Sequence, residues 1–117
     1  MEIIVVNLRQ GGLYMLLREC FLEDRYFRIE STTHALQRMK ERGIESSLVT
    51  GIILSLEDKL LEYNNSGKEI AILDQQNNLA VIIEVRQGKA VVITVIDRAN
   101  IHIKDGTLLE EIAAEIA

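Results

Sequence analysis

Three polar side chains in one short segment have types and a spacing that are useful for chemistry. His34, Arg38 and Arg42 follow one another at intervals of four residues. On a helix this interval turns successive side chains by only about 40°, so the three form one stripe. An imidazole can move a proton near neutral pH, and a guanidinium group can grip a phosphate or stabilise a pentacoordinate transition state. The stripe is therefore a candidate catalytic site.

A solvated polar helix face would show the same spacing. In that interpretation the two arginines pair with Glu41 or Glu45, and His34 helps to satisfy a turn. One histidine without a partnered nucleophile is a weak catalytic signal, and the sequence contains no glycine-rich phosphate loop and no metal-ligand cluster. We therefore expect neither a cofactor nor a metal, and both interpretations of the stripe stay open.

A helical hairpin is expected to carry the stripe. Hydroxyl side chains at residues 31–33 can cap a helix, apolar side chains at positions 35, 36 and 39 give it a buried face, and Gly43 can end it. A second helix is expected to begin at position 46 or 47, and its apolar residues repeat at helical spacing up to Leu56. The two helices would pack side by side.

The rest of the chain predicts a sheet with a further helix near each end. Apolar residues at helical spacing predict a helix over residues 13–21, and a capping-box pattern at Thr107 predicts a C-terminal helix. Alternating apolar residues joined by short turns predict antiparallel strands. These strands are expected at residues 2–7, 25–30, 59–64, 69–74, 79–86, 90–97 and 100–104.

The turn between the two longest of these strands decides where Thr94 lies. A three-residue loop at 86–88 would put Thr94 on the face of Ala80 and Ile82, whereas a two-residue loop would put it beside Val81 on the more apolar face. We expect three residues, because Gly88 suits the left-handed position after a type I turn. Helices should cover the apolar face, and the sparser face would be open to a ligand or a second subunit.

Length and composition predict one domain, residues 1–117. Of these residues 48% are hydrophobic and 26% are charged, as in a soluble globular protein. The net charge of −5 disfavours general affinity for nucleic acids, although one local cationic cluster is compatible with it. No apolar stretch is long enough for a membrane helix, the first residues lack the basic region of a signal peptide, and Cys20 is a lone cysteine. We expect a cytoplasmic protein with no membrane partner.

Two segments resemble a bacterial domain-of-unknown-function family, numbered forty-two fifty-eight. They are THALQRMKERGI at residues 33–44, which carries the family pattern His-Ala-x-x-Arg-Met-x-x-Arg-Gly-Ile, and LAVIIEVRQGKAVVITVID at residues 79–97. The family is grouped with the barnase, EndoU, colicin and RelE-like ribonuclease fold. The resemblance implies an α+β core over residues 26–97, with two N-terminal helices packed on an antiparallel sheet. Residues 1–25 would add a strand and a helix, and residues 98–117 another strand and helix.

The resemblance also implies a site and a function. His34, Arg38 and Thr94 would be catalytic and Arg42 would bind substrate in a metal-independent endoribonuclease of a toxin–antitoxin or conflict system. RNA and a cognate antitoxin would then be partners, and we expect a homo-oligomer. Because the motif offers one histidine and the family's proline after the second helix is absent, an inactive or regulated relative is favoured. The alternative is a non-catalytic interaction or dimerisation module that kept the fold.

Overall fold

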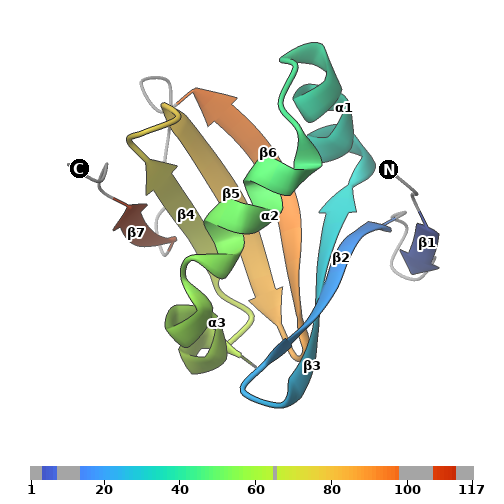
Figure 1. The fold of residues 1–117 in the computed structure, drawn as a ribbon, viewed down its shortest axis with the longest axis vertical. Coiled ribbons are helices and arrows are strands. Elements are labelled where there is room, and N and C mark those ends of the chain that lie inside the picture. The colour runs from blue at the N-terminus through green and yellow to red at the C-terminus, as the bar shows by residue number, and fades with distance from the viewer. Residues whose placement is uncertain (1–3, 8–13, 65, 98–106, 113–117) are drawn as a thin grey trace.

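The computed structural model describes residues 4–7, 14–64, 66–97 and 107–112 (Figure 1). The helices follow three strands rather than standing at the start of the domain. In chain order the described elements are β1 (Ile4–Asn7), β2 (Tyr14–Leu22), β3 (Arg25–Thr32), α1 (Thr33–Glu41), α2 (Ser46–Leu54), α3 (Glu57–Tyr63), β4 (Glu69–Asp74), β5 (Leu79–Arg86), β6 (Lys89–Asp97) and β7 (Leu108–Ile112).

One mixed sheet joins the described strands in the order β1-β2-β3-β6-β5-β4-β7. The pairs β3–β6 and β4–β7 are parallel, and the other neighbouring pairs are antiparallel. The expected purely antiparallel sheet is therefore wrong. The long connection through α1, α2 and α3 carries the chain away from β3, so that β6 can return beside β3 in the same direction.

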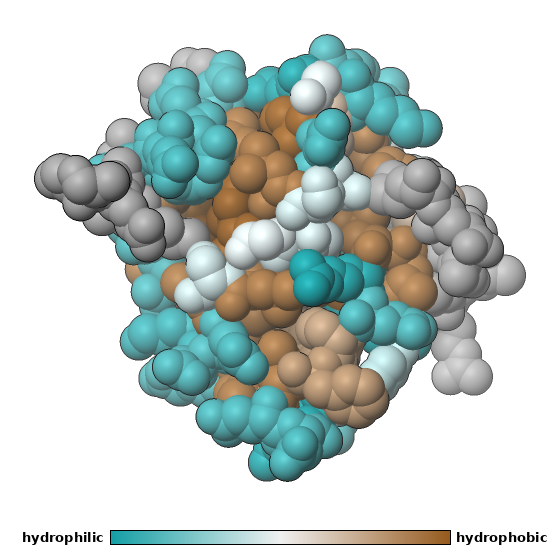
Figure 2. Space-filling view, in the orientation of Figure 1, coloured by the Kyte–Doolittle hydropathy of each residue, from teal (hydrophilic) through white to brown (hydrophobic). Residues whose placement is uncertain are grey.

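The three described helices lie on one face of the sheet (Figure 1), and the core lies between helices and sheet. The β5 residues on this face are buried in one cluster with side chains of α1 and α2, as the alternation predicts: Leu79, Val81, Ile83 and Val85. Figure 2 shows apolar side chains in the middle of this side of the molecule and polar ones around its margin. None of the described helices is long and apolar enough to cross a membrane.

The helix that carries the stripe begins and ends as the sequence predicts. Thr32 Oγ1 accepts a hydrogen bond from the backbone N–H of Ala35 at 3.1 Å, which satisfies one free donor of the first turn. Gly43 follows the helix with a φ of +65°, and the N–H of Ile44 donates to the carbonyl of Met39 at 2.8 Å. This Schellman arrangement closes α1 and directs the chain into α2.

The helix expected over residues 13–21 is wrong, because this segment forms β2 and pairs with β3. The register shifts between Leu16 and Arg18, so Leu17 is an extra, bulged residue of β2. Leu17 and Cys20 both pack against the core. A strand with one bulge therefore imitates helical spacing. Cys20 is partly buried there, and burial raises the pKa of its thiol.

The strand expected at residues 59–64 is also wrong, because Glu57–Tyr63 form α3. A short apolar run fits either structure by periodicity alone. Glu57 and Asp58 decide in favour of the helix, since carboxylates in a first turn lie at the positive end of the helix dipole. Leu60 is then buried in the core.

The C-terminal helix expected from Thr107 is the third error, because Leu108–Ile112 form β7 and pair with β4 in parallel. Backbone pairing at the open edge of β4 outweighs the local capping pattern. The Tyr63 hydroxyl donates to Glu110 Oε1 at 2.8 Å and so ties α3 to this edge strand. The strand expected at residues 100–104 lies outside the described residues.

The β5–β6 hairpin has a shorter loop than expected, yet Thr94 lies on the expected face. The loop has only residues 87–88, and of these only Gly88 has a positive φ, +74°. The positive φ expected of Gly88 is thus present in a two-residue loop, so this signal does not require the longer loop. Further along, β6 takes one extra residue, and this bulge brings Thr94 opposite Ile82.

Candidate functional site

The helix α1 lies beside the second half of β6. Among the described strands β3 pairs with β6 only through residues 89–92, so the rest of β6 pairs with β5 alone. Thr32 Oγ1, at the start of α1, donates to the carbonyl oxygen of Ile93 at 3.4 Å. Arg42 Nη1, just past the end of α1, lies 3.6 Å from Asp97 Oδ1. These contacts tie both ends of the helix to one stretch of strand.

The two lengths match. A helix rises about 1.5 Å per residue, so His34 and Arg42 are separated by about 12 Å along the axis of α1. A strand advances about 3.3 Å per residue, so residues 93–97 span about 13 Å. The stripe of His34, Arg38 and Arg42 therefore runs along α1 beside this half of β6, over its whole length.

Two members of the stripe are open to solvent. His34 is exposed and forms no hydrogen bond or ion pair with other described residues. The Arg38 side chain is 43% exposed, and Nη1 lies 3.9 Å from Glu41 Oε2, a surface contact of small energy. Arg42 is the more constrained member, through Asp97. An imidazole and a guanidinium on one accessible edge can exchange a proton with a bound molecule and hold an anion there.

Thr94 is separated from this edge by the direction of its side chain. It pairs with Ile82, between the β5 residues Val81 and Ile83 that face the core, so it lies on the opposite, helix-free face of the sheet. No hydrogen bond joins Thr94 to the stripe in the described part of the chain. The structure thus brings three of the four predicted site residues together and leaves Thr94 behind the strand.

A charged cluster on the helix-free face was not anticipated from the sequence. Glu30 of β3 is fully buried, and its Oε1 accepts a hydrogen bond from Lys89 Nζ of β6 at 3.1 Å. Its Oε2 lies 3.4 Å from Arg28 Nε but accepts no hydrogen bond from the described residues. A buried carboxylate needs such cations, because burial alone disfavours its charge. We call Tyr14, Arg28, Glu30, Glu84, Arg86 and Lys89 together the sheet-face cluster.

β5 and β2 complete the sheet-face cluster. Arg86 Nε donates to Glu84 Oε1 at 2.7 Å, and this bond raises the pKa of the guanidinium above its ordinary value. The Tyr14 ring lies 5.2 Å from Lys89 Nζ and 5.8 Å from the Arg86 guanidinium carbon, within cation–π range. The cluster holds β2, β3, β6 and β5 together. Because the Glu30 carboxylate is buried, we interpret the cluster as a structural network and not as a surface for substrate.

The chain was compared with protein-family models, curated proteins and solved structures, and none of the three comparisons gave a match. Within the described residues, no group of three or more His, Cys, Asp or Glu side chains is placed to hold a metal ion. We call the surface formed by His34, Arg38 and Arg42 the α1 edge. The resemblance to a ribonuclease family stays a prediction.

Proposed function

We propose that the protein is a metal-independent endoribonuclease that acts at the α1 edge. The observation that supports the proposal is the exposed pair His34 and Arg38, which α1 holds beside a half-strand of β6 that is open on that side. RNA supplies its own nucleophile, the 2′-hydroxyl group, so the protein needs to provide only a proton acceptor and a cation.

Each residue of the stripe then has one role. His34 takes the proton of the 2′-hydroxyl while its oxygen attacks phosphorus, and Arg38 stabilises the extra charge of the phosphorane. The bond from phosphorus to the 5′ oxygen breaks, and water supplies the proton of the leaving oxygen, which leaves a cyclic phosphate. Arg42 keeps its contact with Asp97 and holds the end of the helix in place. Thr94 has no role in these steps.

Cleavage of a labelled RNA tests this proposal. His34→Ala and Arg38→Ala should each lower the rate by at least about 100-fold, the usual scale for such groups. Both should change the free energy of unfolding by less than about 0.5 kcal/mol, because both positions are exposed. Lys59→Ala removes an exposed cation of α3 and is the matched control. A wild-type protein that neither binds nor cleaves several RNAs at low salt would contradict the proposal.

A non-catalytic interaction module is the second candidate, and two observations favour it. The stripe of His34, Arg38 and Arg42 holds one histidine and no second proton-transfer group. At the tip of the β2–β3 hairpin, Phe21 is 71% exposed and Tyr26 is 48% exposed, with ring centroids 6.0 Å apart. Exposed aromatic pairs are typical of protein interfaces. A mass measurement by light scattering that changes with Phe21→Ser would support a homo-oligomer built on this tip.

A further inference from the structure

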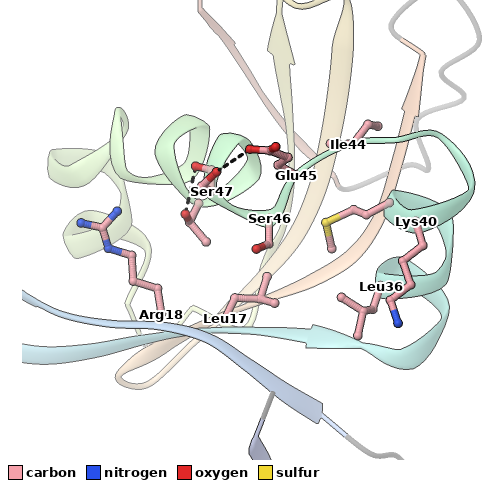
Figure 3. Close-up of a pocket in the computed structure, with 10 residues that line it drawn as sticks. Leu17, Arg18, Leu36, Lys40, Ile44, Glu45, Ser46 and Ser47 are labelled. Carbon is pink, nitrogen blue, oxygen red and sulfur yellow. Dashed lines mark hydrogen bonds between the residues drawn. The ribbon is translucent and has the colours of Figure 1, made fainter. Parts of the chain in front are cut away.

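A cavity on the other flank of α1 has the lining of a small-molecule site. It lies between β2, α1 and the start of α2 and has a volume of about 620 Å³ (Figure 3). Ligand sites usually measure about 300–1,000 Å³ and combine apolar walls with a few polar groups. Leu36 and Lys40, one helical turn apart, line it from α1, whereas the stripe of His34 and Arg38 lies on a different flank. The cavity is therefore independent of the proposed ribonuclease edge.

The bulge of β2 directs a cation to this cavity. In a regular strand Leu17 and Arg18 would point to opposite faces of the sheet. The register shift places Arg18 opposite Ile29, a core residue on the helix side, so Leu17 and Arg18 both line the cavity. Bulges often re-aim a side chain at a functional site. Arg18 is exposed, so its guanidinium group is accessible to a ligand in the cavity.

The charges around the cavity are unbalanced. Neither Arg18 nor Lys40 forms an ion pair within the described part of the chain. Among the described lining residues the one carboxylate is Glu45, and its Oε2 already accepts a hydrogen bond from Ser47 Oγ at 3.4 Å. The lining therefore carries two cations and one carboxylate, and this excess of positive charge favours an anionic ligand.

The walls between the two cations are apolar. Figure 3 shows Leu17 and Leu36 between Arg18 on β2 and Lys40 on α1, and Met39 adds a further apolar side chain from the same helix. A purely hydrophilic anion would leave these walls in contact with water, at a cost of about 25 cal/mol for each Å² that a ligand could cover. The lining is complementary to a molecule with both characters.

We propose that the cavity between β2, α1 and α2 binds a small organic anion with an apolar body, of the kind represented by a medium-chain carboxylate. Its apolar part contacts Leu17, Leu36 and Met39, and its charged group pairs with one of the two cations at the ends of the cavity, Arg18 on β2 or Lys40 on α1. The proposal does not depend on RNA cleavage.

Decanoate and its uncharged counterpart 1-decanol test the proposal on the whole chain. The probe is anilinonaphthalene sulfonate, an anion whose fluorescence rises in apolar sites. We expect decanoate to displace the probe, and the double variant R18Q/K40Q to bind decanoate at least about tenfold more weakly, the usual scale for hydrogen bonds to charged groups. The double variant R25Q/K59Q removes two exposed cations elsewhere and should bind as the wild type does.

Three results would overturn the proposal. Equal affinity for 1-decanol and decanoate would show that the cations select nothing. Equal weakening by R18Q/K40Q and R25Q/K59Q would show an effect of net charge only. Failure of decanoate to displace the probe from the wild type would show that the cavity does not take this class of ligand. Thermal unfolding of each variant checks that the fold is intact, since both positions are exposed.

Discussion

The buried carboxylate of Glu30 depends on cations from two strands. Lys89→Met would remove the ammonium group that donates to Oε1 at 3.1 Å and leave the charge with Arg28 alone. Removing one partner of a buried pair costs about 3 kcal/mol, because the remaining charge stays desolvated. We therefore expect Lys89→Met to lower the free energy of unfolding in urea by about that amount.

The double variant Glu30→Leu with Lys89→Met is the matched control for this effect. It removes the buried charge together with its partner, and such replacements are often close to neutral. Urea unfolding should show most of the lost stability restored. If the double variant were as unstable as Lys89→Met alone, the loss would come from packing at Lys89 and not from an uncompensated Glu30.

At this scale the sequence could reveal the stripe but not the sheet-face cluster. His34, Arg38 and Arg42 share one helix, so their spacing alone places them together. Glu30 and Lys89 stand on different strands, and their contact follows from the parallel pairing of β3 with β6. The alternation of Arg28 with Glu30 was a usable signal, because charges at every second position of a half-buried strand share one face. Nothing in the local pattern names the neighbouring strand.

Two glycines in the segment that forms α1 and α2 should respond to the same substitution with opposite signs. Gly43 has a φ of +65°, a conformation that disfavours a side chain, so Gly43→Ala should destabilise the protein by about 1 kcal/mol. Gly51 lies within α2, and an added Cβ there meets no atom within 4 Å. Gly51→Ala should therefore stabilise by up to about 1 kcal/mol through helix propensity. Thermal or urea unfolding measures both, and a Gly43→Ala variant as stable as the wild type would contradict the assignment of Gly43 as the helix terminator.

The elements themselves were predictable where local and global signals agree. The bounds expected for β4 and β5 equal the observed ones, because strict alternation and short turns flank buried strands. The segment of β2 misled because its bulge places Leu17 and Cys20 on one face at helical spacing. The segment of β7 misled because pairing with β4 outweighs a capping pattern that has no tertiary meaning there. Both failures come from partners that lie far away in the sequence.

At the scale of the molecule, the mixed topology decides which groups can act together. β3 stops pairing with β6 after residues 89–92, and the start of α1, which follows β3 directly, contacts the next residue of β6 through Thr32 and Ile93. The stripe is thereby held against the sheet while its outer side stays open. The protein as a whole has a net charge of −5. Any RNA affinity must therefore come from the cationic α1 edge itself.

Salt dependence can separate the edge from the rest of the surface. Each phosphate of single-stranded RNA that a cation neutralises contributes a slope of about −0.7 to the plot of log affinity against log salt concentration. If Arg38 contacts a phosphate, Arg38→Gln should make the slope shallower by about 0.7, as measured by anisotropy of a labelled RNA. Lys59→Gln changes the net charge equally on α3, away from the edge, and should leave the slope unchanged. Equal changes in both variants would assign the binding to overall charge, whereas an effect of Arg38 alone that persists in EDTA would fit a metal-independent site on α1.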